Sequence, residues 1–152
     1  MSVRVQTEDF DVGQELTSMR LSGQSVGAVV SFIGQVRDLN DGNEIQMLTL
    51  EHYPGMTEKA LEAIENEAKA RWNVLESRII HRVGTLKPQD QIVLVAVSSA
   101  HRGDAFSACE FIMDFLKSQA PFWKKEATNQ GERWVEAKLS DDAAQSRWQT
   151  KK

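Results

Sequence analysis

Hydrophobic and polar positions alternate with the period of a β-strand in two segments of the N-terminal half. Residues 26–36 are rich in β-branched and aromatic side chains, and residues 45–53 repeat the pattern, which predicts two strands. The sequence Asn40-Asp41-Gly42-Asn43 lies between them. It favours a tight turn, because Asn, Asp and Gly tolerate the backbone conformations that such turns need. We therefore expect these two strands to pair as a hairpin.

Three other stretches show the helical period. Asp11 is placed to cap a short helix whose apolar positions fall on one face, with Gly23 as its stop. In residues 57–72, apolar side chains recur at helical spacing against Glu and Lys on the other face. Residues 105–116 carry the apolar stripe of a second long helix, which Pro121 ends because proline cannot continue it.

The rest of the periodic sequence predicts short strands. They cover residues 74–83, 91–98, 122–127 and 133–138. From residue 45 onward the predicted order is therefore β-α-β-β-α-β, the split βαβ pattern of a ferredoxin-like α+β fold. The N-terminal helix and the extra antiparallel strand are additions to this core.

The composition is that of one ordinary globular domain. The chain has 152 residues, of which 41% are hydrophobic and 26% charged, so it can bury a core without disulfides. We expect a single domain over residues 1–152. Residues 139–152 are polar and are expected to form a loosely held C-terminal tail, although Trp148 suggests a docking contact.

Charge and motif content disfavour several classes of protein. The net charge of −4 argues against broad nucleic-acid binding, which needs a basic face. No apolar export signal is visible and the longest apolar run, residues 92–97, is too short to span a bilayer, so a cytoplasmic location is expected. Cys109 is the single cysteine and the three histidines lack metal-ligand spacing. We therefore expect no disulfide, metal or cofactor.

The segment from Val97 to Asp104 is a candidate anion site. A strand runs directly into a helix here, so the free N–H groups and the positive dipole end of the helix meet His101 and Arg102. The alternative is a plain strand–helix turn in which Ser99 or Asp104 caps the helix and Arg102 is solvated.

A second candidate site is built from lysines on both sides of Pro121. Lys117 lies in the last turn of the predicted helix, where the helix dipole alone favours a cation. Lys124 and Lys125 lie in a strand-like piece, so alternation sends them to opposite faces and one of them points inward if Phe122 does. Two converging ammonium groups destabilise each other's charge, which makes lysines better proton carriers or nucleophiles.

Other polar residues support weaker interpretations. Arg37 follows a strand just before a loop, a position that suits a phosphate contact but is also common for solvated arginines. His52 and His81 lie inside predicted strands and are interpreted as structural. Cys109 falls on the apolar stripe of the second long helix, which favours core packing over a nucleophilic role.

These segments together resemble the large, catalytic subunits of molybdopterin synthase, the MoaE family. The matching pieces run in order over residues 28–138: SFIGQVRD (31–38), LTLEHYPGMTEKAL (48–61), IIHRVGTL (79–86), VLVAVSSAHRGDAF (93–106), FIMDFLKSQAPFWKKEA (111–127) and GERWVEAK (131–138).

The resemblance implies an α/β hammerhead with an added antiparallel subdomain. It implies a sulfurtransferase that converts cyclic pyranopterin monophosphate to molybdopterin. The implied assembly is a heterotetramer with a central homodimer of this chain, and the implied sulfur donor is a small ubiquitin-like subunit whose Gly-Gly tail carries a thiocarboxylate.

Site residues also follow from the resemblance. The catalytic lysines would be Lys117 and Lys124, and both would also contact the substrate. The remaining pocket residues would be Gln35, Val36, Arg37, His101, Arg102, Lys125 and Glu126.

The chain departs from the family pattern in two places. Lys87-Pro88-Gln89-Asp90 stands where Pro-Gly-Asp or Pro-Gly-Glu is expected, which affects turn geometry. Lys138 stands where Arg is expected and loses the bidentate fork. The alternative function is a non-catalytic ferredoxin-like domain that binds an anionic metabolite. A nucleic-acid-binding module is disfavoured by the acidic balance.

Overall fold

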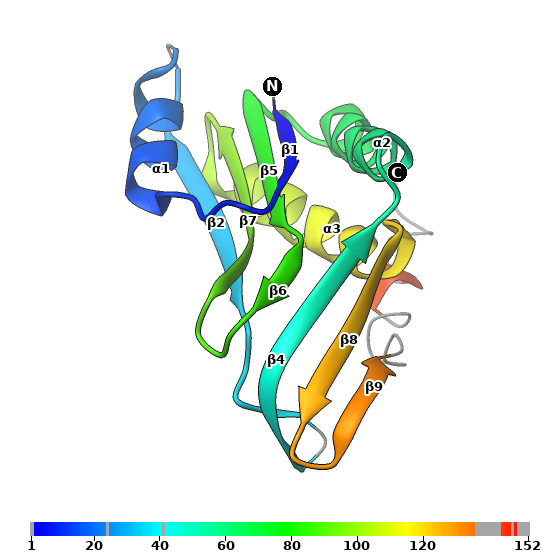
Figure 1. The fold of residues 1–152 in the computed structure, drawn as a ribbon. Coiled ribbons are helices and arrows are strands. Elements are labelled where there is room, and N and C mark those ends of the chain that lie inside the picture. The colour runs from blue at the N-terminus through cyan, green and yellow to red at the C-terminus, as the bar shows by residue number, and fades with distance from the viewer. Residues whose placement is uncertain (1, 24, 41, 136–143, 147, 149–152) are drawn as a thin grey trace.

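A four-stranded sheet forms one half of the molecule (Figure 1). The computed structural model describes residues 2–23, 25–40, 42–135, 144–146 and 148. In these residues the strand order of the sheet is β1-β5-β7-β2. The strands are Val3–Gln6, Glu76–Arg82, Gln91–Ser99 and Ala28–Gln35, in that spatial order. β1 runs parallel to β5, whereas the β5–β7 and β7–β2 pairs are antiparallel.

A second sheet, with the order β3-β4-β8-β9, extends away from the first. Its strands are Leu39–Asn40, Asn43–His52, Phe122–Thr128 and Gly131–Val135, and all neighbours are antiparallel. β6 (Gly84–Leu86) follows β5 almost directly and pairs with β4, so it links the two sheets. Gly84 has φ of +93°, which allows the sharp change of direction between β5 and β6.

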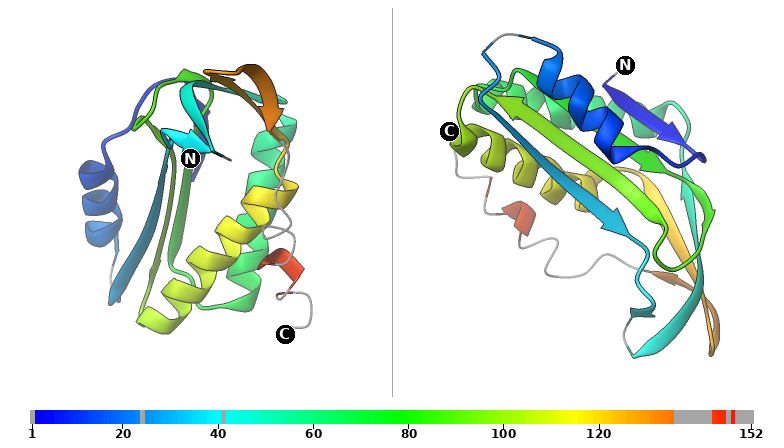
Figure 2. Two further views of the ribbon diagram at one scale, coloured as in Figure 1. Left: turned by 90° about the horizontal axis from the view of Figure 1, so that it is seen from below. Right: turned by 90° about the vertical axis from the view of Figure 1, so that its left-hand side faces the viewer.

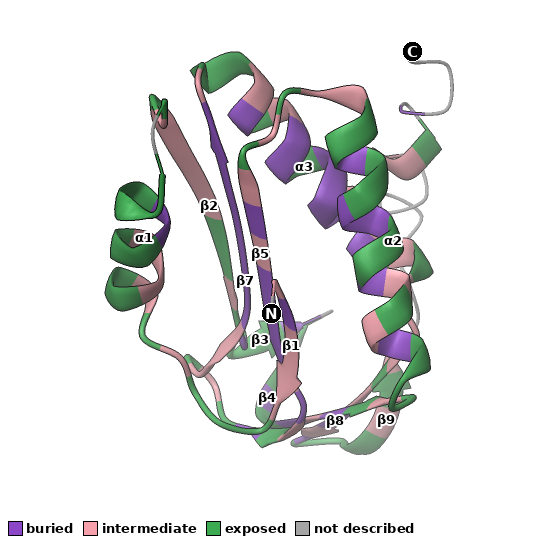
Figure 3. Cartoon of the chain, turned by 90° about the horizontal axis from the view of Figure 1, so that it is seen from above, coloured by how far each residue is buried: buried purple, intermediate pink, exposed green. Residues whose placement is uncertain are grey.

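The three long helices cover both faces of the first sheet (Figure 2). α2 (Met56–Arg71) and α3 (Arg102–Gln119) pack on one face, and α1 (Val12–Leu21) lies on the other. The buried positions of α2 and α3 point toward the strands (Figure 3). Their shared core includes Leu61, Ile79, Val95, Phe111 and Ile112. Each such side chain contributes about 1.5–3 kcal/mol through burial.

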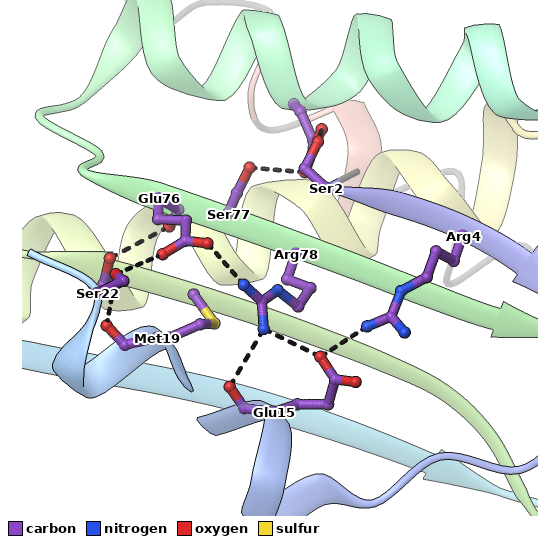
Figure 4. Close-up of polar contacts among 10 residues, drawn as sticks. Ser2, Arg4, Glu15, Met19, Ser22, Glu76, Ser77 and Arg78 are labelled. Atoms are coloured by element: carbon purple, nitrogen blue, oxygen red, sulfur yellow. Dashed lines mark hydrogen bonds and ion pairs between the residues drawn. The ribbon is translucent and has the colours of Figure 1, made fainter. Parts of the chain in front are cut away.

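α1 is held by apolar contacts and by a charged network. Met19 is fully buried against Ile80 and Leu94 of the sheet. Glu15 accepts hydrogen bonds and ion pairs from Arg4 at 2.6 Å and from Arg78 at 2.9 Å, so it connects α1 to β1 and β5 (Figure 4). The helix is thus fixed in its first turn by charges and in its second half by a methionine.

The predicted α+β class is confirmed, and so are the positions of the helices and of most strands. β1, β3 and β6 were not predicted. The core elements β4-α2-β5-β7-α3-β8 occur in the predicted order, but β4 and β8 lie in the second sheet and β5 and β7 in the first. The order of elements along the chain is therefore predictable from periodicity, whereas their division between two sheets is not.

The predicted hairpin between residues 26–36 and 45–53 is wrong. β2 pairs with β7 along its whole length, and the chain crosses to the other sheet after Gln35. The turn around Gly42 does form, but it joins the two-residue strand β3 to β4. The turn was therefore predicted correctly, but the strand that it joins to β4 is β3 and not β2.

Trp148 docks on the helices as its sequence position suggested. Its buried ring packs edge-on against Trp72 and Phe111, and its indole N–H donates to Asp114 at 2.6 Å. The loosely held tail predicted for residues 139–152 lies almost wholly outside the described residues. In the part of the chain that is described, no helix is long and apolar enough to cross a membrane.

Candidate functional site

A cavity of about 630 Å³ lies where the two sheets meet beside the C-terminal half of α3. Apolar side chains from both sheets and from α3 form much of its wall, including Val36, Leu48, Ile92, Met113 and Leu116. Its polar lining consists of Gln35, Arg37, Asn40, His81, Lys117, Lys124 and Glu126. The cavity therefore gathers residues from distant parts of the sequence, and three of them are Lys or Arg.

Lys117 and Lys124 reach the cavity from different elements. α3 ends at Gln119, Ala120 takes an extended conformation, and Pro121 precedes β8. The chain therefore reverses between the two lysines, and both line the same cavity. The convergence that the sequence predicts around Pro121 is present in the structure.

Strand alternation separates Lys124 from its neighbour Lys125. Lys124 lies on the inner face of β8, whereas Lys125 does not line the cavity. The Lys125 ammonium lies 5.6 Å from the ring centroid of Trp134 and 3.8 Å from the carboxylate of Glu132. The prediction that one of these two lysines points inward is confirmed for Lys124, and the structure does not bring Lys125 into the cavity.

Arg37 belongs to a hydrogen-bonded chain of polar side chains. Its guanidinium donates to the Asn40 side-chain oxygen at 3.2 Å, and the Asn40 amide donates to Glu126 Oε2 at 2.7 Å. Arg133 donates to the other carboxylate oxygen, Glu126 Oε1, at 3.1 and 3.0 Å. Glu126 is 4% exposed. Both of its oxygens are engaged by protein, so its charge is balanced by Arg133.

The sequence did not identify Asn40 or Arg133 as site residues. Asn40 was interpreted only as part of a turn, yet its buried side chain orients Arg37. Arg133 lies directly opposite Glu126 in the β8–β9 register. That cross-strand pair could have been found only by predicting the register, which a single sequence does not specify here.

Gln35 and Val36 form one rim of the cavity. The Gln35 side-chain amide donates to the Gln89 main-chain oxygen at 3.2 Å. The Val36 N–H donates a hydrogen bond to the Asp90 carbonyl, and the Val36 carbonyl accepts one from the Gln89 N–H. The turn at residues 87–90 therefore sets the position of this rim.

His101 and Arg102 do not line the cavity of their own chain. They are exposed at the start of α3. Arg102 and Lys117 are roughly 22 Å apart along the helix at 1.5 Å per residue. Ser99 and Asp104 both bond the backbone of Asn73 instead of capping the helix with their side chains. The structure therefore separates the two basic residues from the lysine pair.

Two further ionisable groups have strongly altered pKa values. Burial lowers the pKa of His81, a cavity residue that the sequence analysis treated as structural, to about 3. Burial, assisted by the charge of Glu110, raises the pKa of the Cys109 thiol to about 11. Among the described residues, no group of His, Cys, Asp and Glu side chains could hold a metal ion.

The chain is similar to bacterial molybdopterin synthase catalytic subunits over nearly its whole length. The family model described as MoaE protein matches residues 5–119. The chain is 59% identical to the molybdopterin synthase catalytic subunit of Ralstonia nicotianae, covering 97% of this chain and 84% of that protein. It is 55% identical to the same subunit of Pseudomonas aeruginosa, covering 98% and 99%.

A solved structure shows the same fold. It is the molybdopterin biosynthesis MoaE protein of Burkholderia ambifaria, which superposes with a TM-score of 0.83 at 54% identity and covers 97% of both chains.

Proposed function

The chain belongs to the MoaE family of molybdopterin synthase catalytic subunits, and we propose that its cavity is the place where sulfur is transferred to a pterin. Its relatives carry the name of an enzyme of molybdopterin synthesis over nearly the full length of both chains. The observation that carries the proposal is the convergence of Lys117 and Lys124 on one cavity from opposite sides of Pro121.

The proposed substrates are both anionic. The acceptor is cyclic pyranopterin monophosphate, and the donor is the thiocarboxylated Gly-Gly tail of a small ubiquitin-like subunit. A cavity of about 630 Å³ has the size of a small-molecule site. Its charge comes from Arg37, Lys117 and Lys124, because Glu126 is balanced by Arg133. This local positive charge supports binding of two anions by a chain whose net charge is −4.

The two lysines are assigned complementary roles. The thiocarboxylate sulfur attacks an electron-poor carbon of the pterin, so a C–S bond forms while a C–O bond of the pterin breaks. Water then hydrolyses the resulting thioester, so the sulfur stays on the pterin and the Gly-Gly tail leaves as a carboxylate. Lys117 holds the incoming anionic tail, and Lys124 gives a proton to the departing oxygen. Lys124 suits the proton transfer because it lies on a strand, deeper in the wall than the exposed Lys117.

Arg37 is the proposed phosphate ligand within the same chain, because Asn40 already orients its guanidinium. Glu126 acts by positioning Asn40 instead of contacting substrate. His101 and Arg102 are too far along α3 to join Arg37, so they contribute to a cavity only when a second copy of the chain supplies them. The homodimer expected from the family resemblance provides that second copy.

The first experiment replaces the lysines singly by alanine. Lys117→Ala and Lys124→Ala should each lower molybdopterin formation by about 10²–10⁴-fold, the range for loss of a positioned acid or base. Lys125→Ala is the matched control, because this lysine lies on the outer face of the same strand. Circular dichroism and light scattering should show unchanged fold and assembly. Near-normal turnover of both single variants would contradict the assignment.

A second experiment tests the distant basic pair. Arg102→Ala should raise KM for the pterin by about tenfold or more, because it removes a charge-assisted contact. It should leave docking of the small subunit unchanged. Unchanged KM with loss of docking would instead assign Arg102 to the protein interface. Pterin binding by the wild-type protein with no product, in the presence of the thiocarboxylated partner, would favour a non-catalytic binding domain.

A further inference from the structure

His81 lies in the wall of the cavity and is fixed there on two sides. The residue is 3% exposed. Its ring stacks on Phe122 with centroids 3.8 Å apart and planes inclined by 16°. Its Nδ1 lies 2.8 Å from the main-chain oxygen of Arg82. The ring therefore has both a defined position and a defined orientation relative to the cavity.

The contact with Arg82 determines which ring nitrogen carries the hydrogen. A carbonyl oxygen can only accept, so Nδ1 must be the donor, and Nε2 of a neutral ring keeps its lone pair. Nε2 makes no hydrogen bond within the described residues. Every fully buried side-chain nitrogen or oxygen in this part of the chain does have a partner. Nε2 is therefore open to the cavity that the ring lines.

The surroundings keep this ring neutral. Burial is the largest cause that lowers the pKa of His81 to about 3, and the bond to Arg82 acts in the opposite direction. Electrostatic interactions with Lys124, His52 and Lys117 lower the pKa of His81 further. At neutral pH the side chain is consequently an acceptor among cations, and it does not add a further positive charge.

The other side-chain acceptors of the cavity are engaged or lie at its rim. Both oxygens of Glu126 accept hydrogen bonds from Asn40 and Arg133. The Asn40 oxygen accepts from Arg37. Gln35 is exposed at the rim. Among the described lining residues, Nε2 of His81 is thus the buried side-chain acceptor that remains for a ligand.

We propose that His81 is a specificity-determining residue whose Nε2 accepts a hydrogen bond from an N–H or O–H group of the molecule bound in the cavity. The ligand class is an anionic heterocycle: its anionic group meets Arg37 and the lysines, and its ring donor meets His81. A small anion that has no hydrogen-bond donor does not bind more tightly because of Nε2. A site built to satisfy a donor rejects molecules that lack one. The proposal rests on the proposed function, because it takes this cavity to be the pterin site.

The test uses two replacements of His81 that distinguish the effect of the aromatic ring from the effect of the hydrogen-bond acceptor. His81→Phe keeps an aromatic ring against Phe122 but has no acceptor. His81→Gln places an amide oxygen near the position of Nε2. His52→Phe is the matched control, because this histidine of β4 does not line the cavity. Isothermal titration measures the affinity of each full-length protein for cyclic pyranopterin monophosphate and for inorganic phosphate, and thermal unfolding checks the fold.

His81→Phe should weaken pterin binding about tenfold, the effect of one lost hydrogen bond, and should leave phosphate binding unchanged. His81→Gln should recover most of the affinity, and His52→Phe should behave as the wild type. Equal weakening of pterin and phosphate binding, or unchanged pterin affinity in folded His81→Phe, would overturn the proposal. So would a folded His81→Gln variant that binds no better than His81→Phe.

A measurement on the wild-type protein covers the case in which the variants do not fold. In ¹⁵N-labelled protein, the Nε2 resonance of His81 should move upfield when the pterin is added, because its lone pair then accepts a hydrogen bond. An unchanged resonance at saturating pterin would overturn the proposal. Turnover by the wild-type protein is assayed separately, so a failure of the proposed function is distinguishable from a failure of the His81 contact.

Discussion

Gln89 has a backbone conformation that favours glycine. Its φ is +77°, and Asp90 N–H donates to the Lys87 carbonyl at 3.0 Å. Lys87-Pro88-Gln89-Asp90 is therefore a type II turn with proline at its second position, and such turns need a positive φ at the third. The family resemblance led us to expect Gly where Gln89 stands. The substitution that looked like a minor departure in the sequence is thus a point of backbone strain beside the rim of the cavity.

Gln89→Gly should stabilise the protein by about 0.5–1 kcal/mol. Relief of the left-handed strain of about 1–2 kcal/mol is partly offset by the greater backbone entropy of glycine in the unfolded chain. Urea unfolding measures the difference, and Gln130→Gly, at an exposed turn position for which no positive φ is found, is the control and should not stabilise. A loss of stability in Gln89→Gly would mean that contacts of the Gln89 side chain stabilise the fold by more than the strained backbone destabilises it.

Cys109 illustrates a residue whose chemistry is suppressed by its place in the core. It is 4% exposed, its pKa is raised to about 11, and its thiol points toward the Val95 carbonyl at 3.8 Å. The thiolate that sulfur transfer through a persulfide would need is therefore scarce at neutral pH.

Cys109→Ser should retain most of the sulfur-transfer activity. Placing a hydroxyl in the core should cost about 0.5–2 kcal/mol of stability, lessened where the hydroxyl bonds Val95. The measurement is dithiolene formation with the thiocarboxylated partner, alongside Lys124→Ala as the inactive reference. A folded but inactive serine variant would show that sulfur passes through Cys109, and the proposed mechanism would have to be abandoned.

At the scale of elements, local signals were reliable and pairing was not. Asp11 does cap α1, accepting from the Gln14 N–H at 3.0 Å, and α3 ends two residues before Pro121. These features depend on contacts within a few residues, which a single sequence displays. The pairing partner of β2, in contrast, is decided by contacts between segments that are far apart in the sequence. β7 pairs with β2 from a distance of more than fifty residues, so the nearer β4 was wrongly preferred.

The attachment of α1 should depend on pH through Glu15. Burial acts to raise the pKa of Glu15, but hydrogen bonds and charges from Arg4 and Arg78 outweigh it, and the pKa is lowered from 4.5. A lowered folded-state pKa means that the carboxylate stabilises the fold above pH 4.5. This contribution is lost as the pH falls through the folded-state value.

Glu15→Gln should therefore be about 1–2 kcal/mol less stable than the wild type at pH 7. The difference should shrink steadily as the pH is lowered from about 4.5. Denaturant unfolding at a series of pH values measures it. Glu62→Gln, at an exposed position of α2, controls for general charge effects. A difference between wild type and Glu15→Gln that stays constant down to pH 3 would contradict the role given to the Arg4 and Arg78 contacts.

At the scale of the whole molecule, the sequence located the lysines of the site but not the residues that hold Arg37. Lys117 and Lys124 are separated by one helix end, so their convergence follows from Pro121 and strand alternation. Asn40 and Arg133 meet Glu126 across separate strands, and only the fold brings them together. His101 and Arg102 present the reverse case, because the resemblance groups them with the lysines and the length of α3 separates them.

That separation makes a prediction about mixed dimers. Suppose that a second copy supplies Arg102 to the cavity that contains Lys117. A chain with Arg102→Ala then removes a residue from its partner's cavity and leaves its own cavity complete. A chain with Lys117→Ala removes a residue from its own cavity. In a dimer of these two chains both defects fall in one cavity, and the other cavity is complete.

Each homodimer of a single variant should be impaired. The mixed dimer, isolated with two different affinity tags, should recover about half of the wild-type activity, since one of its two cavities is complete. The matched control combines Lys117→Ala with Lys124→Ala. Each chain then damages its own cavity, so the mixed dimer should stay inactive. If the Arg102 and Lys117 variants fail to complement, or if light scattering at micromolar concentration shows the wild-type chain to be monomeric, Arg102 does not act across a dimer. Arg102 could then reach the cavity of its own chain only if α3 moved. This fold does not favour such a movement, because the helix packs against β7.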